Sequence, residues 1–100
     1  MRTMLRVSFP VEKSNQAIRD GSLPKIMESF MGEMKPESAY FFADGGMRSA
    51  QFVFDMKDAS QIPVIAEQFF MGLNADVDFR PVMNADDLKA GLATTMKRMG

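Results

Sequence analysis

Two strand-like runs of mixed apolar and polar residues lie in the middle of the chain, at residues 38–43 and 47–55. Successive side chains of a strand point to opposite faces of a sheet, so each run can present an apolar and a more polar side. Between the runs stands Asp44-Gly45-Gly46, a strong signal for a tight turn. We therefore predict a β-hairpin over residues 38–55. Its turn pair is either Asp44-Gly45 or Gly45-Gly46.

Two more strands are predicted near the ends of the chain. In residues 3–9, Leu5, Val7 and Phe9 alternate with three less apolar positions that include Arg6. Residues 76–82 place valine, phenylalanine and proline on one side and two aspartates with an arginine on the other. The proline near the end of this run is typical of an edge strand, because proline cannot donate a ladder hydrogen bond.

In the second half of residues 12–34, apolar residues recur at helical spacing, and Gly21 divides this stretch. We predict a short helical piece over residues 14–20, followed by a longer helix with Ser22 as its N-cap. A second helix is predicted after Ser60, which is its expected cap, with Pro63 in the first turn. Gly72 and Asn74 end it.

The last predicted helix begins at Asn84, which forms a potential capping box with the acidic residue three positions later, Asp87. Lys97 and Arg98 suit the negative end of its dipole. The helix carries an apolar stripe made of Leu88, Leu92, Met96 and Met99.

The order strand, helix, strand, strand, helix, strand, helix predicts an α+β protein with a ferredoxin-like βαββαβ arrangement and an extra C-terminal helix. One hundred residues suffice for one domain, so we assign residues 1–100 to a single domain. Its antiparallel four-stranded sheet should carry helices on one face. The other face then combines Tyr, Phe, Met and Val with polar residues, a mixture that is too apolar to be left fully in water. We expect a homodimer in which two such faces enclose a pocket.

The amino-acid composition limits the kinds of ligand and cofactor that we expect. A net charge of −1 argues against nucleic-acid binding, and no apolar run is long enough for a membrane span. The absence of cysteine fits a cytoplasmic protein, and the absence of histidine removes the commonest metal ligand and general base. We therefore expect no cofactor. The aspartate pairs at 76/78 and 86/87 match no recognised metal loop, so we expect no metal. The eleven methionines fill core gaps or line an adaptable pocket.

Six residues are candidates for ligand binding on the uncovered face. Arg6, Asp78 and Arg80 come from strands that neighbour each other in the predicted sheet, and an arginine there could hold a carboxylate through two hydrogen bonds. The alternative is a structural ion-pair network. Tyr40 could orient a polar ligand together with Ser49 and Gln51, or donate a proton. The alternative is an interface tyrosine.

The chain also resembles the dimeric α/β-barrel superfamily and, within it, a family of small uncharacterised bacterial proteins. The residues that carry the resemblance are Lys35-Pro36-Glu37-Ser38-Ala39-Tyr40-Phe41, Gly46-Met47-Arg48-Ser49-Ala50, Asp55, Asp58-Ala59-Ser60-Gln61-Ile62-Pro63, Asn74-Ala75, Pro81-Val82-Met83 and Asp87-Leu88. The resemblance covers most of the chain and implies a barrel formed by two subunits. The superfamily includes cofactor-independent monooxygenases, lactone isomerases, haem enzymes and amino-acid sensors, and fold alone does not choose among them.

Three functional hypotheses follow. The first is a homodimeric module that binds a small, partly apolar anion between two sheets. The second is a cofactor-independent enzyme of the monooxygenase or isomerase type that uses the same pocket. The third is a sheet face that binds a different protein.

Overall fold

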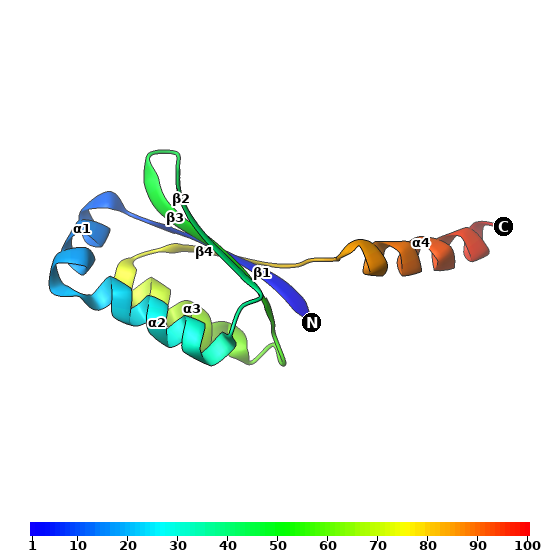
Figure 1. Ribbon diagram of the computed structural model, residues 1–100, viewed down its shortest axis with the longest axis horizontal. Coiled ribbons are helices and arrows are strands. Elements are labelled where there is room, and N and C mark those ends of the chain that lie inside the picture. Colours follow the sequence, from blue (N-terminus) through cyan, green and yellow to red (C-terminus); the bar gives the residue numbers. More distant parts are fainter.

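The computed structural model describes all 100 residues of the chain. It contains four strands and four helices (Figure 1). In chain order these elements are β1 (Arg2–Phe9), α1 (Val11–Asp20), α2 (Ser22–Met34), β2 (Ser38–Asp44), β3 (Met47–Asp55), α3 (Gln61–Leu73), β4 (Asp76–Pro81) and α4 (Ala85–Met99).

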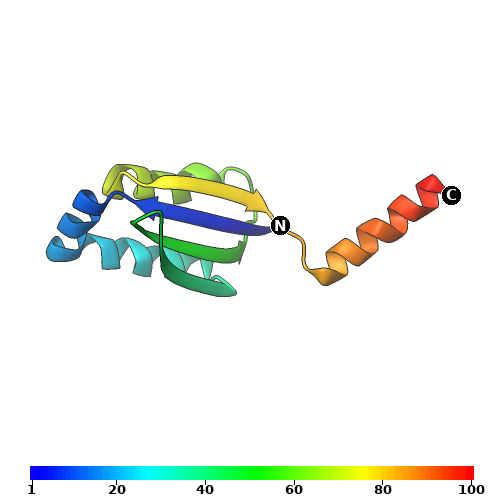
Figure 2. The same cartoon turned by 90° about the horizontal axis from the view of Figure 1, so that it is seen from above.

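The strands form one sheet in the order β2-β3-β1-β4, and every neighbouring pair is antiparallel. Helices α1, α2 and α3 lie against one face of this sheet, as Figure 1 shows edge-on. Figure 2 looks onto the opposite face, which no helix covers. The α+β class and the antiparallel four-stranded sheet are thus confirmed. The arrangement is compatible with the predicted ferredoxin-like fold.

The core lies between the sheet and helices α2 and α3. Its centre is Phe30 of α2, which is fully buried and whose ring centroid lies 4.7 Å from that of Phe52 and 5.7 Å from that of Phe54. Phe69 of α3 completes the group at 5.8 Å from Phe30. Leu5 and Val7 of β1 are also fully buried on this side. The apolar side of the alternating pattern on β1 and, from Ala50 to Phe54, on β3 therefore faces the helices, whereas Arg48 on the same side of β3 is exposed.

The hairpin turn is Gly45-Gly46. Both glycines have positive φ, +60° and +79°, and Asp44 pairs with Met47 across the turn. Two left-handed residues give a turn whose twist matches that of the flanking strands. This selects between the two turn pairs that the sequence left open.

Two predicted caps differ in detail from the structure. Ser22 is the first residue of α2 and not its N-cap, which is Gly21. The N–H of Ser22 is satisfied instead by Asp20 Oδ1 at 2.8 Å. Ser60 is the N-cap of α3, but its side chain makes no capping hydrogen bond. Both helix starts are therefore held by an aspartate two residues upstream, since Asp58 Oδ1 accepts from the Ser60 N–H at 2.9 Å.

The first helical segment is longer than predicted, because α1 begins directly after Pro10. Proline fixes its own φ and its carbonyl accepts the first helical hydrogen bond, from the Ser14 N–H at 2.9 Å. The capping box at α4 is confirmed: Asn84 Oδ1 accepts from the Asp87 N–H at 2.8 Å, and Asp87 Oδ2 accepts from the Asn84 N–H at 3.0 Å.

Helix α4 stands apart from the rest of the molecule and extends its long axis to 59 Å (Figures 1 and 2). None of its residues is buried. The predicted stripe is exposed throughout, from 48% at Leu88 to 77% at Met99. None of the four helices combines the length and apolar character that crossing a lipid bilayer requires.

Candidate functional site

We call the uncovered surface of the sheet the open face. Strand register arranges its side chains in three rows, each crossing all four strands from β2 to β4. The rows are Ser38, Val53, Met4 and Arg80; Tyr40, Gln51, Arg6 and Asp78; and Phe42, Ser49, Ser8 and Asp76. All six candidate residues from the sequence therefore lie on this face, and four of them form the central row.

Arg6 does not pair with Asp78, its neighbour across the β1–β4 ladder. Its Nη2 pairs with Asp44 Oδ2 at the end of β2. To reach Asp44 the side chain crosses the ring of Phe42, with the guanidinium carbon 5.3 Å from the ring centroid. This distance is within the range of a cation–π contact. Arg6, Phe42 and Asp44 thus form one cluster at the hairpin end of the open face.

Asp78 and Arg80 make a separate pair on β4, with Arg80 Nε donating to Asp78 Oδ2 at 3.0 Å. The three charged candidates are therefore divided between two ion pairs and do not form a single cluster. Both pairs are more than a third exposed, and such pairs contribute little to stability. Their arginines can exchange one carboxylate for another at small cost.

Sequence reasoning missed the roles of Asp44 and Phe42. The sequence pattern identifies Asp44 only as a turn residue and does not single out Phe42. Strand alternation could have identified both residues, because Phe42 and Asp44 lie two and four positions after Tyr40 and therefore share its side of β2.

Ser49 is largely satisfied within the chain. Its Oγ lies 3.0 Å from Ser8 Oγ across the β1–β3 pair and donates to the carbonyl of Met47 at 3.2 Å. Its residue exposure is 3%, so a ligand can reach little of it. Ser49 is therefore the least accessible of the six candidates.

Tyr40 and Gln51 are the open polar groups of the central row. They pair directly across the β2–β3 ladder, and neither side chain makes a hydrogen bond within the chain. Tyr40 is 67% exposed. Together they offer a phenolic O–H, an amide N–H₂ and an amide oxygen beside the Arg6 guanidinium. This combination can orient a molecule that bears both an aromatic or aliphatic part and a charged oxygen.

The large pKa shift of the molecule belongs to Asp55, at the end of the sheet next to α4 and away from the central row. Hydrogen bonds from Lys57 Nζ and the N-terminal ammonium lower the pKa of Asp55 to about 2. The ammonium nitrogen lies 2.7 Å from Asp55 Oδ1. A hydrogen bond to Glu37, at 2.7 Å from Nε, raises the pKa of Arg2. These contacts fix the N-terminal strand and do not activate a group for acid–base chemistry.

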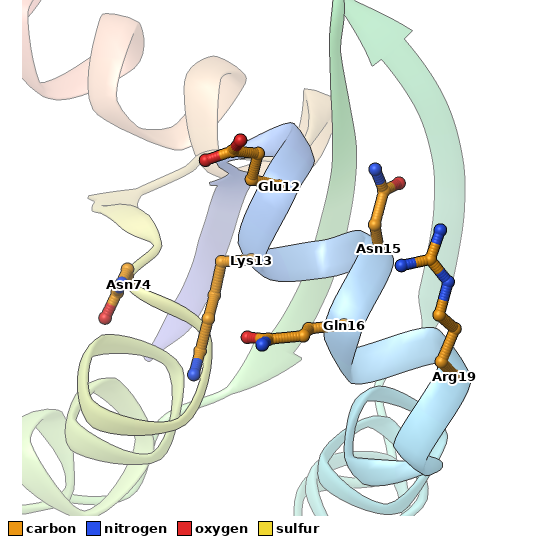
Figure 3. Close-up of a pocket in the computed structure, with 6 residues that line it drawn as sticks. All are labelled: Glu12, Lys13, Asn15, Gln16, Arg19 and Asn74. Atoms are coloured by element: carbon orange, nitrogen blue, oxygen red, sulfur yellow. The ribbon is translucent and has the colours of Figure 1, made fainter.

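A polar hollow of about 570 Å³ lies beside α1, but its side chains do not converge (Figure 3). Lys13 and Gln16 point toward the end of α3, where Asn74 lies, whereas Asn15 and Arg19 lie on the other side of the helix. A binding site needs groups directed at a common point. This hollow does not provide them.

No group of three or more acidic side chains is arranged to hold a metal ion. No protein-family model matches the chain, and no curated protein matches it at a significant level.

Proposed function

We propose that the protein is a homodimeric module in which two open faces enclose a pocket for a small, partly apolar anion. The observation that carries this proposal is the composition of the open face. Tyr40 and Phe42 are exposed there, and Met4 and Val53 are only half-buried. A contiguous surface of this kind is usually covered by another molecule.

The exposed stripe of α4 supports self-association independently. Leu88 and Leu92 are about half exposed although their spacing is that of a covered helix face. The base of the helix is tied to the body by the Asn84–Asp87 capping box and by a 3.4 Å contact between Arg2 Nη1 and Asp87 Oδ2. A helix held away from its own core gains its apolar contacts from a second chain.

The central row supplies the proposed specificity. In a dimer with two-fold symmetry, each subunit contributes Arg6, Tyr40 and Gln51 to the enclosed space. A ligand carboxylate would compete with Asp44 for the Arg6 guanidinium, and the Tyr40 hydroxyl and Gln51 amide would hold its other polar atoms. The apolar part would lie against Phe42 and Val53.

This assembly is the one that the dimeric α/β-barrel superfamily uses, and we propose that the chain is a member from the small bacterial family that it resembles. An enzymatic role in the same pocket, of the cofactor-independent monooxygenase or isomerase type, is a second candidate. The unbonded hydroxyl of Tyr40 favours it, because a phenol aimed into a pocket can donate a proton to a reacting oxygen.

Native mass spectrometry of freshly purified protein tests the proposal, since it reports subunit number and retained small molecules together. We expect a dimer, and a bound mass that is lost in Arg6→Gln. A clean monomer at micromolar concentration contradicts the proposal. Turnover of small aromatic or lactone substrates that is lost in Tyr40→Phe would favour the enzyme over the binding module.

A further inference from the structure

A second cavity lies on the other side of the hairpin, where the tip of β2 and β3 extends beyond the helical layer. It is a groove of about 400 Å³ between the hairpin and the junction of α1 and α2. Seven of its nine lining residues are hydrophobic, among them Phe9, Ile18, Leu23, Met27 and Phe41. Its volume falls within the range of small-molecule sites.

Arg48 lies at this groove without a carboxylate partner. Arg2, Arg6 and Arg80, the other arginines of the sheet, each form an ion pair, whereas Arg48 forms none. A single nitrogen, Nη1, donates to Ser14 Oγ at 2.7 Å, Asn15 Oδ1 at 2.9 Å and, more weakly, the carbonyl of Val11 at 3.5 Å. Three neutral acceptors therefore position the guanidinium without neutralising its charge.

The remaining donors of Arg48 are unused. A guanidinium carries five N–H groups, and the contacts to α1 involve only Nη1, so Nη2 and Nε donate to nothing within the chain. Ser14, the nearest acceptor, is fully buried, which anchors this contact in the body of the protein. The arrangement resembles that of a prepositioned anion-binding group beside an apolar space.

Arg19 adds a second positive charge nearby. It lies one turn beyond Asn15 on α1, and Figure 3 shows its guanidinium directed toward Asn15, the residue that accepts a hydrogen bond from Arg48. Arg19 also forms no ion pair, since no carboxylate oxygen lies within 4 Å of its guanidinium nitrogens. An anion bound by Arg48 would lie in the field of both arginines.

We propose that this groove is a separate binding site for an amphiphilic carboxylate. The apolar tail occupies the space lined by Ile18, Leu23, Met27 and Phe41, and the carboxylate accepts hydrogen bonds from Nη2 and Nε of Arg48. The site is complete within one chain. It is therefore independent of the dimer proposed above, although Phe42 and Ser49 line the groove and also belong to the open face.

The test uses octanoate as the probe and uncharged octanol as its matched control, with binding followed by NMR shifts of the labelled protein. Octanoate should saturably shift the signals of Ile18 and Phe41. Replacing Arg48→Gln should weaken octanoate binding about tenfold, the typical effect of losing a charge-assisted hydrogen bond. Octanol should bind wild type about tenfold more weakly than octanoate and should be insensitive to this variant. Arg98→Gln, an exposed position in the last turn of α4 that belongs to neither site, should leave the affinities for octanoate and octanol unchanged.

Ile18→Asp provides a second variant, because Ile18 is 47% exposed and its replacement does not disturb the core. It should abolish octanoate binding even if Arg48→Gln fails to fold. The proposal is overturned by any of three results: no saturable shift up to the solubility limit of octanoate, equal affinity in wild type and Ile18→Asp, or shifts confined to Tyr40 and Gln51. Subunit number, measured on the same samples, should be unaffected by either groove variant, which separates this test from that of the dimer.

Discussion

Val53→Lys is the perturbation that most directly tests whether the open face is an interface. Val53 lies on β3, one of the two central strands, between Ser38 of β2 and Met4 of β1. In one chain the residue is only half-buried, so a lysine can extend its ammonium into water and the monomer should fold normally. In a face-to-face dimer the same ammonium would be enclosed.

The magnitude follows from this position. Full burial of a valine side chain is worth about 1.5–3 kcal/mol. Because the chain itself already covers about two thirds or more of Val53, association can gain at most about 1 kcal/mol per subunit, or about 2 kcal/mol per dimer. Two enclosed ammonium groups add a desolvation cost of at least about 1 kcal/mol each. The total, up to about 4 kcal/mol, corresponds to a dissociation constant raised by up to about a thousandfold.

Sedimentation equilibrium over a range of protein concentrations measures this change. The matched control is Val64→Lys, the same substitution at a 62% exposed position of α3, on the helical side of the molecule. We expect the control to keep the dissociation constant of wild type. If Val53→Lys remains as dimeric as the control while circular dichroism shows both to be folded, the open face is not the interface.

Three further predictions concern stability and pH. Phe30→Ala removes the ring that contacts three other phenylalanines, so it should lower the free energy of unfolding by about 3–5 kcal/mol. Urea denaturation measures this change. The control Met71→Ala, at a position that is 75% exposed, should lower this free energy by less than about 0.5 kcal/mol. Asp55 has a folded pKa of about 2, below its ordinary value of 3.8, so its stabilising effect is present above about pH 4 and is lost as the pH falls toward 2. The stability difference between wild type and Asp55→Asn should therefore narrow over that interval, and a constant difference would contradict the assignment. Truncation after Asn84 removes a helix with no buried residue, so the urea midpoint measured at a concentration where the protein is monomeric should stay near that of the full chain.

The layers of the fold could be predicted from the sequence because each strand has two chemically different sides. Leu5 and Val7 are buried while Arg6 between them is not, and the same alternation holds on β3 from Ala50 to Phe54. Specific local motifs also predicted the structure correctly: the Asn84–Asp87 pair forms the capping box at the start of α4. Ser22 was misassigned because serine and aspartate both satisfy helix N-termini, and only the backbone path shows which of Asp20 and Ser22 does so.

The position of α4 could not be predicted. An amphipathic stripe indicates that a helix face prefers to be covered, but it contains no information about which surface covers it. In the isolated chain the stripe stays exposed, since the polar contacts at Asn84 and Asp87 hold the helix base away from the core.

The grouping of the candidate site depends on one feature that the sequence left open, the pair of residues at the hairpin turn. With Gly45-Gly46 at the turn, Tyr40 faces Gln51 and so enters the row of Arg6. With Asp44-Gly45 there, the register would slip by two residues and Tyr40 would face Ser49, in the row of Ser8. Both registers keep every candidate residue on the open face. The alternation of the sequence therefore predicts which residues lie on this face, but not which of them are neighbours across the strands.

The same turn determines which carboxylate Arg6 meets. With Gly45 and Gly46 both at positive φ, Asp44 becomes the last paired residue of β2 and turns its side chain onto the open face, four residues beyond Tyr40. Arg6 then crosses Phe42 to reach it and leaves Asp78 to Arg80. Asp44 thereby holds the guanidinium over an aromatic ring in an exposed pair that a ligand carboxylate can replace. The turn glycines, which touch no ligand, therefore set the position of the anion-binding group in the proposed pocket.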